Sequence, residues 1–281
     1  MFIKDTFKFI ATNKRLIIVA LCPAVLWSFF ASPASLIPSL FNYRIITDAE
    51  TGQLIGPFRN LGAALNVLAP VKNPLWLLLL LPVAFIFCAV MFGFSEHKMR
   101  VGNYGFGGFL QRINFGVTAL AVPFVLLCSI YFIWMFATAC VLVFIEYICL
   151  GLIGSRALSF VMVIIFALLL FILFILLASL TLLWPAVTLI SGYGPMDSWY
   201  YQLKLLSGRM IKFAISAGVV FFINSALITS FGLFLGGLNM VFINIVCFTF
   251  TLMYLVGLSM TAYFRLSNTP RKDMKTKYYL R

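Results

Sequence analysis

Few residues in this chain have types and spacings that could support chemistry. The one histidine, His97, lies in Ser95-Glu96-His97-Lys98, directly beside Glu96 rather than one helical turn away from it. A single histidine cannot supply a histidine cluster for a metal ion, and no Ser/His/Asp arrangement can be built around it. We interpret Glu96 and His97 as part of a solvated basic loop. The sequence therefore predicts no catalytic residue, no metal site and no cofactor, and it indicates that the protein is not an enzyme.

The cysteines offer no redox or metal motif. All six lie within or at the ends of apolar runs and none forms a CxxC pair: Cys22, Cys88, Cys128, Cys140, Cys149 and Cys247. Free cysteine behaves as a small apolar side chain in such surroundings. We interpret them as buried packing residues, and they leave the redox compartment open.

Polar residues inside apolar runs are the remaining candidates for a site. Glu146 is the one acidic residue in such a run, and an ionisable group at membrane depth suggests a proton or cation relay. The alternative places Glu146 near the outer end of its span, beside the interfacial residue Tyr147. The other polar candidates, Asn224, Ser225, Asn239 and Asn244, could form hydrogen bonds between helices or line a water-filled cavity. Together the candidate intramembrane polar site comprises Glu146, Asn224, Ser225, Asn239 and Asn244.

Composition assigns the chain to the membrane proteins. Of the 281 residues, 63% are hydrophobic and only 10% are charged, against roughly 45 to 50% and 25% in soluble domains. Six long uncharged runs lie near residues 16–36, 74–94, 115–148, 157–190, 210–231 and 239–264. Continuous runs of this length indicate helices, because a membrane barrel would show short alternating strands. We predict an all-α polytopic bundle of six transmembrane helices that forms a single domain over residues 1–281.

The positions of the basic residues predict the orientation of these helices. Placing the N-terminus in the cytoplasm leaves only Arg44, Arg59, Lys72 and Arg156 outside, among 20 lysines and arginines. Basic residues are retained in the cytoplasmic segments of membrane proteins. We therefore expect a multi-pass protein of the plasma (inner) membrane with both termini in the cytoplasm. The net charge of +13 is explained by this orientation, and nothing supports binding to nucleic acid.

One apolar run is long enough to be split into two helices. No base occurs from Ile113 to Ser155, but splitting this run would place the later basic segments outside. The sequence therefore predicts one helix over 115–148, of about 34 residues and roughly 50 Å, longer than the roughly 30 Å hydrocarbon core. Pro123 and Pro185 are the candidate kink positions.

Similar segments suggest three repeated units, each an amphipathic arm followed by a helical hairpin. Phe9 to Arg15, with Pro23, is echoed one hundred residues later by Phe109 to Phe115, with Pro123. A looser third copy runs from Asp197 to Arg209. Chance similarity between apolar segments is the alternative explanation.

The arms and the tail are candidates for contact with lipid. Met196, Trp199, Tyr200 and Leu203 recur with helical spacing, which is typical of a helix at a membrane surface. A loop packed on the bundle is the alternative. The candidate lipid-facing residues are Trp199, Tyr200, Lys204 and Arg209, with Arg271 and Lys272 of the basic tail over 265–281.

The outer loop, residues 37–73, is the one sizeable segment expected outside. Tyr43 to Gly56 predicts a small hairpin with a glycine-containing turn. Phe58 to Leu68 predicts an amphipathic helix. The loop either caps the bundle or contacts an external partner.

About 25 residues resemble a known group of proteins. They comprise Trp184-Pro185-Ala186-Val187, then Gly192-Tyr193-Gly194-Pro195-Met196-Asp197-Ser198-Trp199, then Leu206-Ser207-Gly208-Arg209. This pattern is similar to bacterial six-span membrane proteins related to the membrane domain found beside glycerophosphodiester phosphodiesterases. Ser191 stands where such families usually have a glutamate. The resemblance implies a membrane module without catalytic residues.

Two functions remain as hypotheses. The first is a non-catalytic membrane protein, a scaffold or accessory subunit, that binds membrane lipids or partner membrane proteins through its cytoplasmic arms and outer loop. The alternative is a permease or channel subunit for a small solute, which would use the fifth and sixth spans and Glu146. The sequence leaves the oligomeric state open.

Overall fold

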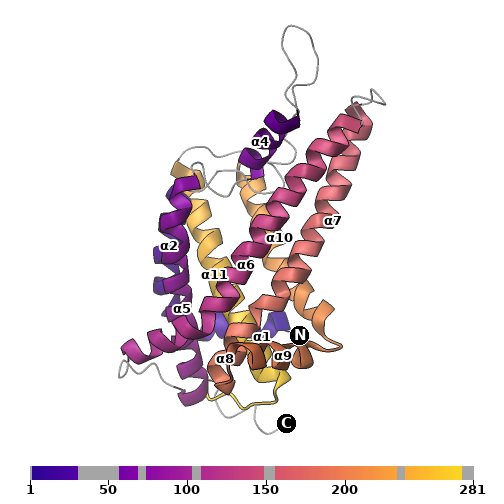
Figure 1. Ribbon diagram of the computed structural model, residues 1–281. Helices are drawn as coiled ribbons and strands as arrows, with labels where there is room; N and C mark the ends of the chain where they lie inside the picture. Colours follow the sequence, from indigo (N-terminus) through magenta and orange to yellow (C-terminus); the bar gives the residue numbers. More distant parts are fainter. Residues whose placement is uncertain are drawn as a thin grey trace.

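The computed structural model of this chain is a bundle of helices (Figure 1). It describes residues 2–30, 57–68, 74–102, 109–148, 156–232 and 238–273, and these ranges contain no strand. Five helices are long and apolar enough to cross a membrane. A sixth crossing results if α1 (Phe2–Thr12) and α2 (Leu16–Phe30), which meet at 98°, count as one span. The predicted all-α polytopic membrane bundle is confirmed.

Three helical hairpins make up the bundle. α2 pairs with α5 (Leu77–Val101), α6 (Phe109–Glu146) with α7 (Arg156–Leu182), and α10 (Met210–Gly232) with α11 (Leu238–Leu266). The shorter elements are α4 (Pro57–Leu68), the 3₁₀ turn η1 (Pro74–Trp76), α8 (Trp184–Ser191) and α9 (Pro195–Leu206). The predicted hairpin over 43–56 lies outside the described residues, whereas the predicted helix after it is confirmed by α4.

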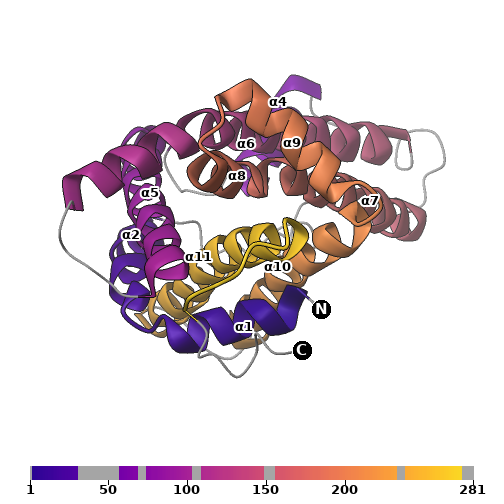
Figure 2. The same cartoon turned by 90° about the horizontal axis from the view of Figure 1, so that it is seen from below.

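α2 and the five long helices pack in a ring that is filled at one end. Each helix packs on the next in the order α2, α5, α6, α7, α10, α11, and α11 packs again on α2. At the lower end in Figure 1, α8 contacts α5, α6, α7 and α11, and α9 packs on α8 (Figure 2). The residues Trp184, Pro185, Ala186 and Val187 of α8 are all buried. The short helix α8 therefore fills that end of the ring.

α11 is the most buried of the candidate spans. Half of its most apolar stretch is buried, a larger share than in the other four long helices. Its buried positions include small residues such as Gly257, Ser259 and Ala262, and small residues let neighbouring helices approach closely in lipid. By contrast, α7 exposes large apolar side chains such as Leu169 and Ile172, as a helix in contact with lipid does.

The long run after Ile113 forms one helix. α6 is an unbroken helix of 38 residues, about 57 Å long at 1.5 Å per residue, so the prediction of one helix is confirmed. It contains Pro123 within its length. At Pro185, however, the next long segment is interrupted, because α7 ends at Leu182 and α8 begins at Trp184.

The second predicted arm is described only from Phe109 onward, and residues 103–108 before it lie outside the described part. α1 and α9 are distinct helices, but Phe109 to Arg112 form the first turn of α6. Asn13 caps α1 by donating from Nδ2 to the Phe9 carbonyl oxygen at 2.7 Å, whereas the matching residue in the second copy is Ile113, which cannot form such a bond.

The segment around the histidine is also helical, so its interpretation as a loop was wrong. Glu96 and His97 lie in the last two turns of α5. Arg100 donates from Nη1 to Glu96 Oε1 at 2.8 Å, an ion pair one turn apart that supports a helix. Hydropathy falls before the helix ends, which is why the sequence pattern suggested a loop.

Replacing Gly116 by alanine is expected to destabilise the α5–α6 pair. A Cβ atom at Gly116 would overlap the backbone oxygen of Ala89, and one at Gly93 would lie 2.6 Å from the Arg112 oxygen. Forcing the two backbones apart should cost about 1–3 kcal/mol and lower the thermal midpoint in detergent. Gly218→Ala is the control, because its nearest neighbour is the movable end of Ile175 at 3.2 Å. Equal midpoints for the two variants would contradict the close packing.

Candidate membrane-surface interface

Most of the described basic residues lie at one end of the bundle, which we call the basic end. It comprises α1, α8, α9, the last turns of α5 and residues 265–273 (Figures 1 and 2). α4 lies at the opposite end and carries Arg59. The basic end therefore gathers the segments that the charge pattern placed together.

α1 lies across the basic end and is fixed by its apolar face. Phe2, Thr6, Phe9 and Asn13 recur with helical spacing and are all buried. The Phe9 ring packs where Gly257 of α11 has no side chain, because a Cβ there would lie 2.6 Å from Phe9 Cδ1. The Phe2 ring meets Phe213 of α10 edge to face. α1 is thereby packed on both helices of the third hairpin.

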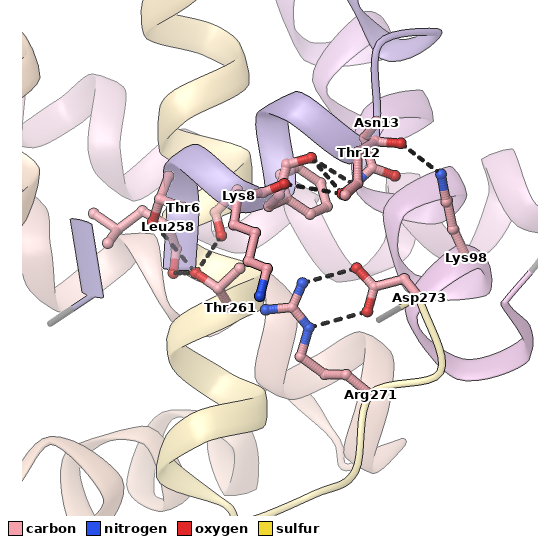
Figure 3. A network of polar contacts seen from close by, with 11 residues as sticks. Thr6, Lys8, Thr12, Asn13, Lys98, Leu258, Thr261, Arg271 and Asp273 are labelled. Atoms are coloured by element: carbon pink, nitrogen blue, oxygen red, sulfur yellow. Dashed lines mark hydrogen bonds and ion pairs between the residues drawn. The ribbon is translucent and has the colours of Figure 1, made fainter. Parts of the chain in front are cut away.

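Polar contacts tie α1 to the ends of α5 and α11 (Figure 3). The hydroxyl oxygens of Thr6 and Thr261 are 3.3 Å apart, and Asp5 forms an ion pair with Arg265. Because both charged side chains are about 30% exposed, this pair contributes modestly. Lys98 Nζ donates to the Thr12 carbonyl oxygen at 2.8 Å, and a cation at a helix C-terminus is favourable.

The start of the basic tail packs against the end of α5. The Lys272 amide donates to the Met99 carbonyl oxygen at 2.9 Å. Arg271 donates to both carboxylate oxygens of Asp273, at 3.0 and 2.7 Å. The Arg271 side chain is only 11% exposed, whereas Lys272 is exposed. Of the two tail residues that were predicted to face lipid, only Lys272 is exposed.

α9 is held against α8 by its inner face. Gln202 Nε2 donates to the Leu180 carbonyl oxygen at 2.6 Å. In a continuous helix this carbonyl would instead accept a bond from the backbone N–H of residue 184. Trp184 Nε1 donates to the Pro195 carbonyl oxygen at 2.9 Å, and the indoles of Trp184 and Trp199 pack with centroids 4.8 Å apart. Gln202 thus satisfies a backbone group at the α7–α8 break.

The outer face of α9 is apolar and basic together. Met196 and Tyr200 are 64% and 66% exposed. Leu203, Lys204 and Arg209 are also exposed, whereas Trp199 is half-buried against Trp184. The predicted helical stripe therefore exists as an exposed surface, with Trp199 turned partly into the bundle.

Three of the five candidate intramembrane polar residues, Asn224, Asn239 and Asn244, have described side chains. Asn239 is exposed at the start of α11, whereas Asn244 is only 5% exposed. Asn224 on α10 has a buried Oδ1 with no hydrogen-bond partner among the described residues. Glu146 is the last residue of α6, but its side chain and that of Ser225 lie outside the described part. The neighbouring Tyr147 hydroxyl accepts a bond from Asn60 Nδ2 of α4 at 3.1 Å.

Some important residues of the basic end were missed from the sequence. Asp5, Thr6 and Gln202 each form a contact across the fold that no local motif marks. A usable signal existed for α1, since Phe2, Thr6, Phe9 and Asn13 share one helix face. The ion pair of Asp5 with Arg265 joins residues 260 positions apart and had no such signal.

The described residues contain no group of three or more His, Cys, Asp or Glu side chains that could hold a metal ion. Comparison with family models, with curated proteins and with solved structures found no match to this chain.

Phe9→Ala is expected to loosen α1 from the bundle. The Phe9 side chain is 1% exposed, and removing a buried phenylalanine costs about 3–5 kcal/mol. Phe7→Ala on the same helix is the matched control, because Phe7 is 44% exposed and should cost much less. Limited proteolysis after Lys8 and the thermal midpoint measure the difference, and equal sensitivity of both variants would contradict the role of Phe9.

Proposed function

We propose that this chain is a non-catalytic multi-pass protein of the plasma (inner) membrane that binds anionic phospholipids through its basic end, with both termini in the cytoplasm. In this role it serves as a scaffold or accessory subunit for partner membrane proteins. The observation that carries the proposal is the outer face of α9, where exposed Met196 and Tyr200 adjoin exposed Lys204.

An exposed face of this composition suits the boundary between headgroups and acyl chains. Apolar and aromatic side chains enter the interface, while lysine and arginine remain at the level of the phosphates. Each base near an anionic surface contributes on the order of 1 kcal/mol. Lys204, Arg209 and Lys212 are all exposed beside this face, so the end of α9 and the start of α10 favour an anionic membrane.

The packing of α9 explains how this face keeps its orientation. Ser198, Gln202 and Leu206 are buried on the opposite side of the same helix. The bond from Gln202 to Leu180 and the Trp184–Trp199 contact hold α9 in one rotation on the bundle. A helix fixed in this way presents the same residues to the membrane without a cost of ordering on binding.

A permease or channel subunit is the second candidate function. It is favoured by Asn224 Oδ1, a buried oxygen without a hydrogen-bond partner among the described residues, because such a group suits a polar solute. Against it, the buried residues of α8 fill the basic end of the ring, so a solute path there requires α8 to move. Saturable solute flux in liposomes holding the purified chain would favour this second function.

Neutralising the bases beside α9 is expected to weaken binding of anionic lipid. We expect Lys204→Gln with Arg209→Gln to reduce the phosphatidylglycerol retained by the purified chain about thirtyfold, at about 1 kcal/mol per base, with phosphatidylcholine unchanged. Native mass spectrometry of mixed micelles measures both lipids. Arg59→Gln removes an exposed base at the opposite end and is the control. An equal loss in that control would contradict a specific role for α9.

Orientation is tested by labelling introduced cysteines. In a chain without its native cysteines, Arg100→Cys and Ser207→Cys at the exposed basic end should react with an impermeant maleimide only after the membrane is opened. Arg59→Cys, at the other end, should react in intact cells. The reverse pattern would place the basic end outside and contradict the proposed orientation.

A further inference from the structure

Three aromatic rings from α1 and α11 meet beside the buried face of α1. Phe7 lies outside that buried face and is 44% exposed. The centroid of its ring lies 6.0 Å from that of Phe250 and 5.9 Å from that of Tyr254, both on α11. The rings of Phe250 and Tyr254 are in turn 6.0 Å apart. Each ring therefore contacts the other two, and we call the three residues the Phe7–Phe250–Tyr254 cluster.

The position of the cluster along α11 places it on the membrane side of α1. α11 begins at the end opposite the basic end and reaches the basic end at Leu266 (Figure 1). Phe9 packs at Gly257 of this helix, and Tyr254 and Phe250 lie about one and two helical turns farther from the basic end. Phe7, which contacts both rings, is thus turned toward the part of the span that lipid surrounds.

The cluster is fixed on one side and open on the other. Tyr254 is 1% exposed, and its hydroxyl donates to the Ser216 carbonyl oxygen of α10 at 2.9 Å. Phe250 is half-buried, and Phe7 is exposed. The bond to α10 holds the inner ring in place, so the open surfaces of the other two rings keep one arrangement. A preformed apolar surface binds a chain without a cost of ordering.

A lysine adjoins the open ring of α1. Lys4 is exposed and precedes Phe7 by three residues, a spacing that places two side chains next to each other on a helix. Lysine extends its ammonium group toward water and phosphate while its methylene groups remain along apolar surface. A ring in the acyl region with a cation one turn away complements an anionic phospholipid, in which the phosphate adjoins the acyl chains.

We propose that the Phe7–Phe250–Tyr254 cluster and Lys4 bind one anionic phospholipid of the cytoplasmic leaflet, with an acyl chain on the rings and the phosphate beside Lys4. The site rests on the proposed function for its leaflet, but it is formed by α1 and α11 and not by the outer face of α9. A lipid in this site contacts both helices at once. Because a ligand that binds the folded state stabilises it, the lipid strengthens the packing of α1 on the bundle.

The test is photocrosslinking of the full chain in non-ionic detergent, where only bound lipid remains beside the protein. The probe is phosphatidylglycerol with a diazirine on one acyl chain, added in small molar excess, and the labelled peptides are mapped. We expect labelling of α1 and of the α11 peptide that carries Phe250. Phe7→Ala should lower this labelling about fivefold, a factor that corresponds to about 1 kcal/mol. Phe136→Ala, which removes a 53% exposed ring on α6, is the matched control and should leave it unchanged.

A second variant tests recognition of the headgroup. Lys4→Gln should lower labelling by the phosphatidylglycerol probe about fivefold, at about 1 kcal/mol per base. Labelling by phosphatidylcholine with the same diazirine chain should be weaker and should not respond to this variant. Lys272→Gln is the control, because Lys272 is an exposed base whose backbone bonds the end of α5. Phe7 and Lys4 are both exposed, so the variants should fold, which circular dichroism checks.

Two results would overturn the inference. Phe7→Ala and Phe136→Ala could lower the labelling of α1 equally, or the phosphatidylcholine probe could label α1 as strongly as phosphatidylglycerol does. If Lys204→Gln with Arg209→Gln lowered the labelling of α9 while Phe7→Ala left that of α1 unchanged, the proposed function would stand and this site would fall. If labelling of α1 depended on Phe7 and Lys4 while α9 bound no lipid, the site would stand and the proposed role of α9 would fail.

Discussion

The arrangement of the basic end depends on the packing of α1 against α11. Phe9 packs where Gly257 has no side chain, and Asn13 caps the helix so that the chain can turn by 98° into α2. This turn places Lys8 on the same side of the bundle as the end of α5 and the tail (Figure 3). A larger residue at 257 would displace α1 and separate these segments.

Satisfaction of backbone polar groups in lipid explains the rest of the ring. A helix that crosses a membrane must pair its own amides and carbonyls, so any break needs side chains that replace the lost bonds. At the break before α8, Gln202 supplies one such bond to Leu180. The same side chain fixes α9 on the bundle. The bond that Gln202 gives to the Leu180 carbonyl thus also turns the opposite face of α9 outward.

Patterns within one segment were sufficient for the fold class and for part of the site. Apolar runs predicted the long helices, and the spacing from Met196 to Leu203 predicted the exposed stripe of α9. Contacts between distant segments were beyond such patterns. The pairing of Arg265 with Asp5 and the burial of Arg271 against Asp273 depend on packing, as does the difference in exposure between Asn239 and Asn244. Glu96 and His97 were misinterpreted because polarity at a helix end resembles a loop.

The exposed bases of the basic end differ from Arg271 in how strongly water and salt screen their charge. Bases such as Lys14, Arg15 and Lys204 are exposed, and water and salt screen them, so they attract any anionic surface. Arg271 differs because its side chain is only 11% exposed and its guanidinium is already paired with Asp273. A fixed cation presents its remaining surface in one direction. The exposed bases therefore suit the attraction to anionic lipid that we propose, whereas the pair of Arg271 with Asp273 belongs to the packing of the tail on the bundle.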